Sequence, residues 1–187
     1  LGRSLNELEL KWPIKHKAMI VILKQIIRKN RIIDGIIYLQ ITRGVAPRQH
    51  AFPEHLNSSL VITAKNLDPF EFDAAKKGIN IITTPEIRWQ RCDIKSISLL
   101  GNCLAKEKAK RADCYEAWFV EDDGMVTEGT SSNAWIVSKE GKLITRNISN
   151  SILNGITRLS IIKVARENDI EIIERPFSIK EAKSAKE

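Results

Sequence analysis

Cysteine is scarce in this sequence, and long apolar runs are missing altogether. Only Cys92, Cys103 and Cys114 occur among 187 residues; none belongs to a CxxC pair, and at least one must stay unpaired. This pattern argues against a disulfide framework and a cysteine-based metal site, and it is typical of a reducing compartment. No stretch approaches the ~18–20 apolar residues that cross a bilayer, and the first ten residues lack the apolar core of a signal peptide. We therefore expect a cytoplasmic protein without a membrane partner.

Aromatic residues are also few, at 6% of the chain, whereas lysine and arginine are plentiful. The formal charge of +7 raises the question of nucleic-acid binding. The basic residues are spread through predicted helices, however, and aromatic side chains are not interleaved with them, which favours an ordinary solvated surface. We therefore expect no nucleic-acid partner. A hydrophobic fraction of 43% and a charged fraction of 28% are typical of globular domains.

The first third of the chain combines a predicted helix with two predicted strands. Apolar residues recur at helical spacing over residues 16–30, which predicts an amphipathic helix. β-branched and aromatic stretches at 36–44 and 60–65 predict strands, joined by a proline-containing loop. Composition changes at Asp68-Pro69, where the residue before proline is biased away from helix. We place a domain boundary there, giving domains 1–68 and 69–187.

Beyond that boundary, strands and helices are mixed without strict alternation, which predicts an α+β fold. Helices are expected over 102–113 and 155–169, and another is expected to begin after an N-cap at Ser178. Asp123-Gly124 and Glu140-Gly141 predict hairpin turns. Strands are expected over residues 78–89, 115–122, 134–139, 142–147 and 170–177.

The stretch RWQRCDIKSISLL places a lysine among apolar residues. If this stretch is extended, Lys95 shares a face with Ile97 and Leu99. A sheltered lysine can pair with a carboxylate, extend its amine to water, or act as a nucleophile whose amine stays uncharged part of the time. Spacing alone leaves these three interpretations open.

Three further stretches combine polar groups with structural breaks. VTEGTSSN, residues 126–133, reads either as a hairpin loop or as a carboxylate and hydroxyls turned into a site. NGITR, residues 154–158, is an ordinary helix start or a phosphate cradle formed by free backbone N–H groups. In RGVAPRQHAFP, Arg48 and His50 are two residues apart, so an extended loop would aim both at one side, where they could grip a carboxylate. The alternative is an exposed polar loop.

Taken together and in this order, the four stretches resemble the class IV aminotransferases, which are fold-type IV pyridoxal-phosphate enzymes. The resemblance runs over essentially the whole chain. It implies a partial small α/β domain over 1–68, followed by a partial cofactor-binding domain over 69–187 with a barrel-like β core and flanking helices. The implied cofactor is pyridoxal 5'-phosphate, with no metal.

The resemblance also implies roles for particular residues. Lys95 matches the lysine that holds the cofactor covalently and moves the substrate proton. Glu128 matches the acid that keeps the pyridine nitrogen protonated, so that the ring can accept electrons. Arg88 matches a further arginine near the site. The remaining implied contacts to the cofactor come from four residues: Ser131 near its face, Leu153 against the ring, and Ile156 and Thr157 at the phosphate.

Arg48 and His50 match the pair that traps the substrate α-carboxylate in the D-amino-acid aminotransferase group, to which the sequence is most similar. The implied reaction moves an amino group from a D-amino acid such as D-alanine to a 2-oxo acid such as 2-oxoglutarate, within a homodimer. The alternatives are a branched-chain aminotransferase, an aminodeoxychorismate lyase, or an inactive remnant of the family.

The family pattern extends beyond both ends of this sequence. Upstream of Leu1 it includes strands of the small domain, a substrate-contacting tyrosine and a phosphate-binding arginine, a role that Arg3 does not match in register. Downstream of Glu187 it includes a Thr/Ser-rich motif and the last strands. The resemblance therefore implies an interior piece of the enzyme, truncated at both ends.

Overall fold

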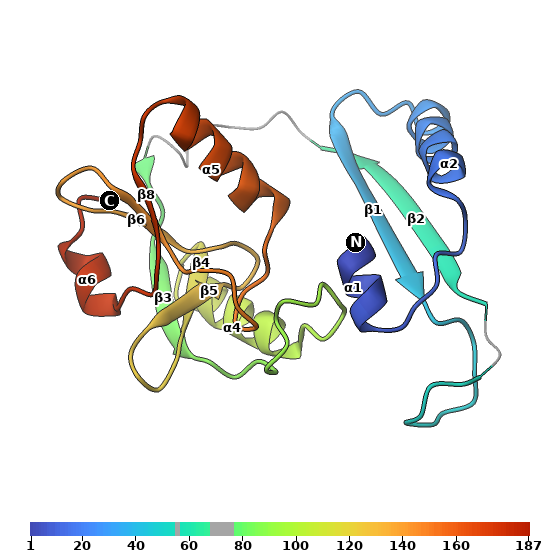
Figure 1. Ribbon diagram of the computed structural model, residues 1–187, viewed down its shortest axis with the longest axis horizontal. Helices are drawn as coiled ribbons and strands as arrows, with labels where there is room; N and C mark the ends of the chain where they lie inside the picture. Colours follow the sequence, from blue (N-terminus) through green and yellow to red (C-terminus); the bar gives the residue numbers. More distant parts are fainter. Residues whose placement is uncertain (55–56, 68–76) are drawn as a thin grey trace. The chain divides into compact units, whose positions relative to one another are not determined.

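The computed structural model describes residues 1–54, 57–67 and 77–187 and divides the chain into two compact units (Figure 1). Unit 1 is Leu1–Asp73 and unit 2 is Ala74–Glu187. The predicted boundary at Asp68-Pro69 lies outside the described residues, so its position stays a prediction.

Unit 1 contains helices α1 (Gly2–Glu7) and α2 (His16–Lys29) and a two-stranded antiparallel sheet. Strand β1 (Gly35–Thr42) pairs along its whole length with β2 (Ser59–Asn66). A side chain at Gly35 would meet the Lys65 carbonyl at 2.5 Å, so the first ladder position requires glycine. The predicted helix and both predicted strands of this region are confirmed.

Unit 2 holds two three-stranded sheets, each combining one parallel and one antiparallel pair. In the first sheet, β3 (Ile81–Pro85) runs parallel to β4 (Glu116–Val120), and helix α4 (Leu100–Arg111) lies between them in sequence. Strand β5 (Val126–Gly129) then pairs antiparallel with β4. The predicted helix and strands in these regions are confirmed, with shorter strands than expected.

The second sheet begins with a hairpin of β6 (Trp135–Val137) and β7 (Leu143–Thr145). Helix α5 (Ile156–Glu167) follows, and β8 (Ile172–Glu174) then pairs parallel with β7. Helix α6 (Ile179–Ser184) ends the unit. The predicted barrel-like core stays a prediction, since the described residues of unit 2 form two separate sheets.

The turn and cap signals in the sequence are confirmed. Gly124 and Gly141 both adopt a φ of +81°, the left-handed conformation that glycine accepts without strain. Ser178 caps α6 by accepting a hydrogen bond from the Glu181 N–H at 3.1 Å. At each of these positions the residues therefore form the local structure that the sequence signal predicts.

Two apolar clusters make up the core of unit 2. One packs side chains of β5, β6, β7 and the Phe177 segment, and the other joins α4 to β4. Trp118 and Phe177 meet edge to face at 5.8 Å between ring centroids.

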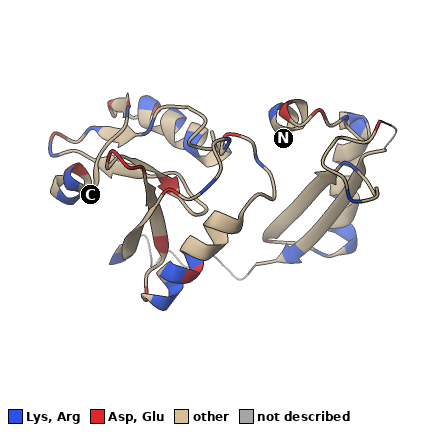
Figure 2. Cartoon of the chain, turned by 90° about the horizontal axis from the view of Figure 1, so that it is seen from below, with Lys and Arg blue, Asp and Glu red and all other residues tan. Residues whose placement is uncertain are grey.

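The basic residues of α4 gather toward its C-terminal end, where they lie at the negative end of the helix dipole (Figure 2). No helix in the described part of the chain is long and apolar enough to cross a membrane.

Candidate active site

Glu128 lies at the centre of a buried polar network in unit 2. Its carboxylate accepts a hydrogen bond from Arg88 Nη1 at 2.5 Å on Oε1. Its other oxygen accepts from Asn133 Nδ2 and from the Leu153 N–H, both at 3.1 Å. The Glu128 side chain is 8% exposed and that of Arg88 3% exposed, so this is a buried ion pair with neutral donors around it. Removing Arg88 from this pair would be costly, because Glu128 would then be a buried charge without its counter-ion.

The local structure at Glu128 differs from the expected loop. Residues 126–129 form strand β5, and all four are buried. Glutamate and glycine are poor strand formers, which is why the sequence pattern misses the strand. Pairing with β4 and the hydrogen bond from the Val126 N–H to the Phe177 carbonyl at 2.9 Å hold the segment extended nevertheless.

Arg88 is fixed mainly by Glu86. Its Nε and backbone N–H donate to Glu86 Oε1 at 2.9 and 3.0 Å, and its Nη2 donates to Glu86 Oε2 at 2.6 Å. The same Nη2 donates to Ser151 O at 3.1 Å, and the guanidinium carbon lies 4.3 Å from the Phe119 ring centroid. This places the predicted arginine beside the predicted glutamate.

The three charges shift one another's pKa values. Burial raises the pKa of Glu128 above its ordinary value of 4.5, and the Arg88 charge only partly offsets this. Burial also acts to raise the pKa of Glu86, but the hydrogen bonds and charge of Arg88 outweigh it and hold that pKa below 4.5. The pKa of Arg88 is raised despite burial, because Glu86 and Glu128 both stabilise its charge. Glu86 is therefore ionised at neutral pH, while Glu128 is the group that can more readily hold a proton.

Asn133 connects this network to the start of helix α5. Its Nδ2 donates to the Leu153 carbonyl at 2.9 Å as well as to Glu128. Two residues later Gly155 caps α5 without a side-chain hydrogen bond. Ile156 and Thr157 open the helix, where backbone N–H groups lack partners inside the helix. The structure thus brings Glu128 and Leu153 together and places Ile156 and Thr157 at the helix start that follows.

Arg158 anchors that helix start. Its side chain is fully buried, and its Nη2 donates to the Arg146 carbonyl at 3.0 Å and to Glu174 Oε2 at 2.6 Å. These contacts tie α5 to the segments at β7 and β8.

The stretch around Lys95 is not extended, so the condition under which Lys95 would share a sheltered face with Ile97 and Leu99 is not met. Residues 88–99 form no strand; the chain turns at Asp93, whose N–H donates to the Asn150 carbonyl at 3.3 Å. This turn buries Asp93 and Ile94 and leaves Lys95 exposed, together with the apolar residues expected beside it. The two-residue alternation assumed an extended backbone, and the turn removes that condition.

Ser131 belongs to a second polar cluster, built on Glu116. The Ser131 hydroxyl donates to Glu116 Oε2 at 3.3 Å, that of Ser132 does so at 3.0 Å, and that of Thr130 donates to Oε1. Burial would raise the pKa of Glu116, but the Thr130 hydroxyl, the Ala117 N–H, the Ser132 hydroxyl and the Lys106 charge together lower it below 4.5. Glu116 therefore fixes the loop between Glu128 and Asn133. Ser131 itself is exposed, and its place near a cofactor stays a prediction.

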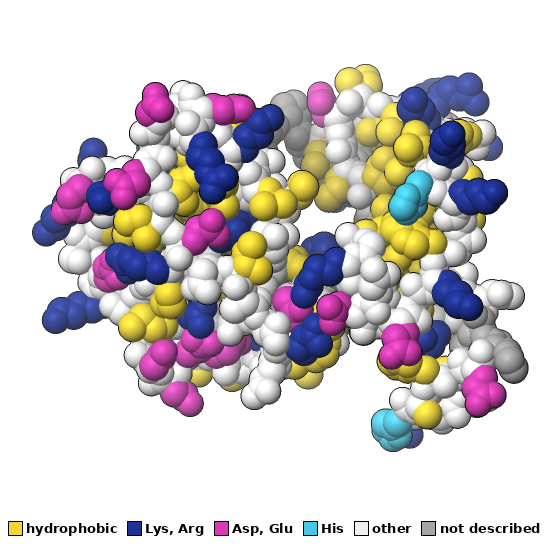
Figure 3. All heavy atoms as spheres, in the orientation of Figure 1, with side chains coloured by type: hydrophobic (Ala, Val, Ile, Leu, Met, Phe, Trp, Pro, Cys, Tyr) yellow, Lys and Arg dark blue, Asp and Glu magenta, His cyan; other side chains and the backbone are white. Residues whose placement is uncertain are grey.

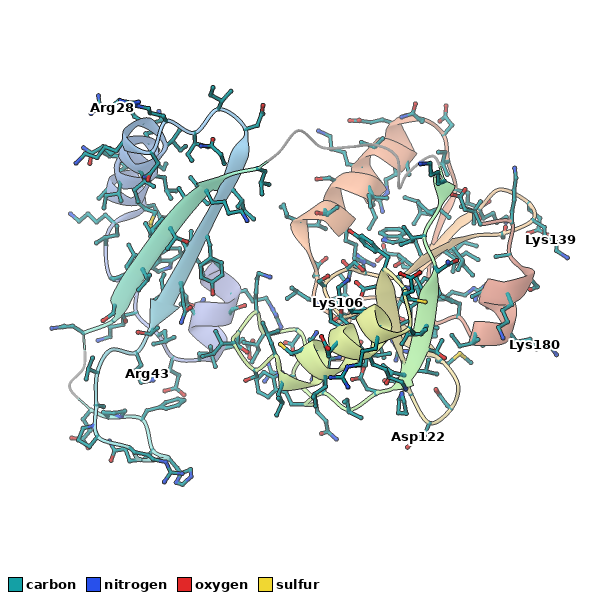
Figure 4. All side chains as sticks on the ribbon, turned by 180° about the vertical axis from the view of Figure 1, so that it is seen from behind. Arg28, Arg43, Lys106, Asp122, Lys139 and Lys180 are labelled. Atoms are coloured by element: carbon teal, nitrogen blue, oxygen red, sulfur yellow. The ribbon has the colours of Figure 1, made fainter. Side chains whose placement is uncertain are left out.

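Arg48 and His50 lie in unit 1, on an exposed loop that bends at both residues. Arg43 holds the base of this loop: its Nη1 donates to the Glu9 carbonyl at 3.3 Å, and its guanidinium carbon lies 3.6 Å from the Phe52 ring centroid. Figure 4 places Arg43 where the loop leaves β1. The substrate-binding role of Arg48 and His50 stays a prediction.

Sequence reasoning missed Glu86, Asn133 and Glu116. Glu86 precedes Arg88 by two residues, and Asn133 ends the VTEGTSSN stretch, so both lie within or beside the stretches singled out. Glu116 had no such signal, because a glutamate in a strand gives no hint of which hydroxyls it will meet.

Comparison with known proteins identifies the family. The model of the family described as Amino-transferase class IV matches residues 1–187 of this chain. The chain is 41% identical to a D-alanine aminotransferase of Staphylococcus aureus (strain MSSA476) over 187 residues, which are 99% of this chain and 65% of that relative. It therefore spans about 65% of the length of this curated relative.

Solved structures agree on the fold. The branched-chain amino acid aminotransferase of Escherichia coli superposes with a TM-score of 0.85 at 24% identity, covering 98% of this chain and 62% of that one. The branched-chain amino acid aminotransferase from Thermobaculum terrenum, in its PLP form, gives 0.80 at 23% identity, covering 98% and 61%. Since the family match spans residues 1–187, the chain belongs to the class IV aminotransferases, a family of pyridoxal-phosphate-dependent transaminases.

Proposed function

We propose that this protein binds pyridoxal 5'-phosphate and moves an amino group from a D-amino acid such as D-alanine to a 2-oxo acid such as 2-oxoglutarate. The observation that carries the proposal is Glu128: a buried carboxylate, paired with Arg88, whose Oε2 is bound by the Leu153 N–H two residues before the α5 cap. The choice of a D-amino acid is supported by the 41% identity to a D-alanine aminotransferase.

The donor groups of this chain fit the chemistry of the cofactor. Glu128 is the acid suited to the ring nitrogen, since a nearby carboxylate favours its protonated form. Ile156 and Thr157 would hold the phosphate through backbone N–H groups and the threonine hydroxyl, at a helix start where no side chain caps the N–H groups. Leu153 would pack against the ring, and Ser131 would lie near its face. When bound, the cofactor supplies an electron sink for the carbanion formed at the substrate Cα.

The remaining roles belong to Lys95, Arg48 and His50. Lys95 would bind the cofactor aldehyde and carry the proton that leaves the substrate Cα. Its exposed side chain is accessible to such a partner. Arg48 and His50 would bind the substrate α-carboxylate through charge-assisted hydrogen bonds.

Three coarser features complete the proposal. The complete fold would have a barrel-like β core in the cofactor-binding domain, the small domain would end near residue 68, and the active form would be a homodimer. Light scattering after size exclusion tests the last point, and a monomer that retains full activity contradicts it.

Absorbance and donor profiling test the function. With added pyridoxal phosphate we expect a band near ~410–420 nm, an ordinary property of a lysine-bound cofactor, that is absent in Lys95→Ala. Borohydride reduction of the cofactor-loaded protein should leave the reduced cofactor covalently attached to Lys95. D-alanine should remove the band faster than L-valine does. A preference for L-valine would indicate a branched-chain aminotransferase, and no band at all would indicate an inactive remnant.

A further inference from the structure

The site contains one more carboxylate than its arginine can neutralise. Glu86, Arg88 and Glu128 form a contiguous group with two negative charges and one positive charge. Both partners of the Arg88–Glu128 pair have side chains less than 10% exposed, so water screens the imbalance weakly. How Arg88 divides its donors between the two carboxylates decides where the remaining negative charge lies.

Arg88 gives most of its donors to Glu86. Three N–H groups of Arg88 bind the two Glu86 oxygens, at 2.6 to 3.0 Å, in the two-point geometry that makes arginine–carboxylate pairs strong. The Thr127 hydroxyl adds a fourth hydrogen bond to Glu86 at 2.8 Å. Only Nη1 of Arg88 reaches Glu128.

The second oxygen of Glu128 meets neutral donors alone. Asn133 contributes an amide N–H and Leu153 a backbone N–H. These bonds orient the carboxylate without cancelling its charge. Glu128 can therefore still act as a counter-ion, which it could not do if the guanidinium were turned fully toward it.

We propose that Glu86 is a positioning residue that keeps Arg88 from neutralising Glu128, so that Glu128 can hold a protonated cofactor nitrogen. The proposal rests on the proposed function of Glu128 and deepens it. Its physical core is competition: the charge of Glu86 offsets the charge of Arg88, and its geometry holds the guanidinium in place. The lowered pKa of Glu86 is consistent with a permanently ionised group in this position.

The test uses pyridoxal phosphate labelled with nitrogen-15 in its ring, added to the full chain. In the wild type, the nitrogen chemical shift should be that of a protonated pyridine. Glu86→Gln keeps the shape and removes the charge, so the shift should move toward neutral pyridine, and the dissociation constant, measured by absorbance titration, should rise about tenfold. Glu86→Asp, which keeps the charge, should retain a protonated nitrogen.

Glu181→Gln is the matched control. It removes a carboxylate from another arginine pair of unit 2, that of Arg175 with Glu181 at 2.5 Å, in a part of the unit that contributes no proposed site residue. Its nitrogen shift and cofactor affinity should equal those of the wild type.

The outcomes separate the two proposals. If wild-type protein binds through Lys95 but Glu86→Gln leaves the nitrogen protonated and the affinity unchanged, the role of Glu86 is refuted while the function stands. If Glu86→Gln does not fold, as judged by near-ultraviolet circular dichroism, Glu86→Asp decides: an unprotonated nitrogen there refutes the role. If wild-type protein does not bind the cofactor at all, both proposals fail.

Discussion

Unit 2 removes far more of its side chains from water than unit 1 does. Among the described residues, unit 1 buries only Ser4, Leu5 and Met19, whereas unit 2 has two apolar clusters and a buried polar network. Apolar side chains of α2, β1 and β2, including Ile20, Tyr38 and Val61, are more than half exposed, and Figure 3 shows yellow side chains open on the surface of unit 1. A two-stranded sheet with so little buried surface is marginal by itself.

The difference extends to the candidate site residues. Glu128 and Arg88 each have several hydrogen-bond partners and buried neighbours. Such contacts hold a side chain in the fixed geometry that a functional site requires. Arg48 and His50 are exposed on a loop held at its base by Arg43. The geometry around Glu128 and Arg88 is thus built by the packing of unit 2, whereas Arg48 and His50 depend on a loop with far less support.

The comparison can be broken most directly with one substitution made in both units. Phe119→Ala removes a fully buried ring from unit 2 and should lower its free energy of unfolding by about 3–5 kcal/mol. Phe52→Ala removes a half-exposed ring that contacts Arg43 and should cost only about 0.5–1 kcal/mol. Native-state hydrogen exchange reports each unit separately. Equal losses would contradict the difference in burial.

A second prediction uses the fact that every buried carboxylate among the described residues lies in unit 2. Folding lowers the pKa of Glu116 below 4.5. The contribution of Glu116 to the free energy of unfolding is therefore present above pH 4.5 and is lost as the pH falls through the folded-state pKa. Glu116→Gln should therefore cost about 1–3 kcal/mol at pH 7 and progressively less below pH 4.5. Urea unfolding between pH 3 and pH 7 measures this. A cost that grows toward acid pH would reverse the assigned sign.

The smallest predicted effect sharpens the comparison from the side of unit 1. Helix α2 begins after Lys15, which makes no side-chain cap, whereas α6 of unit 2 is capped by Ser178. Lys15→Ser should stabilise α2 by about 1 kcal/mol, because a serine hydroxyl can accept from an N–H of the first turn. Slower amide exchange within α2 is the expected readout. Lys17→Ser, inside the helix, is the control and should not slow that exchange.

Local signals in the sequence predicted most of the fold. The helical spacing over residues 16–30, the glycines of the two hairpins and the cap at Ser178 each depend on a few neighbouring residues, and each is confirmed. Strand β5 was missed because its pairing with β4, and not its composition, makes it extended. Local preference fails where distant pairing outweighs it.

The candidate site was only partly predictable. The four stretches contain Arg88 and Glu128, and the structure joins this pair at 2.5 Å. The exposure of Lys95 could not be predicted, because it depends on a turn anchored by the Asn150 carbonyl, far along the chain. Glu86 was missed because its proposed role depends on how a guanidinium divides its donors, which spacing does not encode.

The polar network joins the two sheets of unit 2, and this has a consequence for how the unit assembles. Glu86 follows β3 and Glu128 lies within β5, whereas Asn133 precedes β6 and Leu153 follows β7. A molecule bound here would contact residues of both sheets, so it would bind only after the two sheets have docked. Its binding would therefore indicate that unit 2 has folded. At a concentration one hundred times its dissociation constant, the bound molecule would add about 2.7 kcal/mol to the free energy of unfolding of unit 2. Variants that loosen the docking of the sheets should therefore be rescued during expression by supplying the bound molecule.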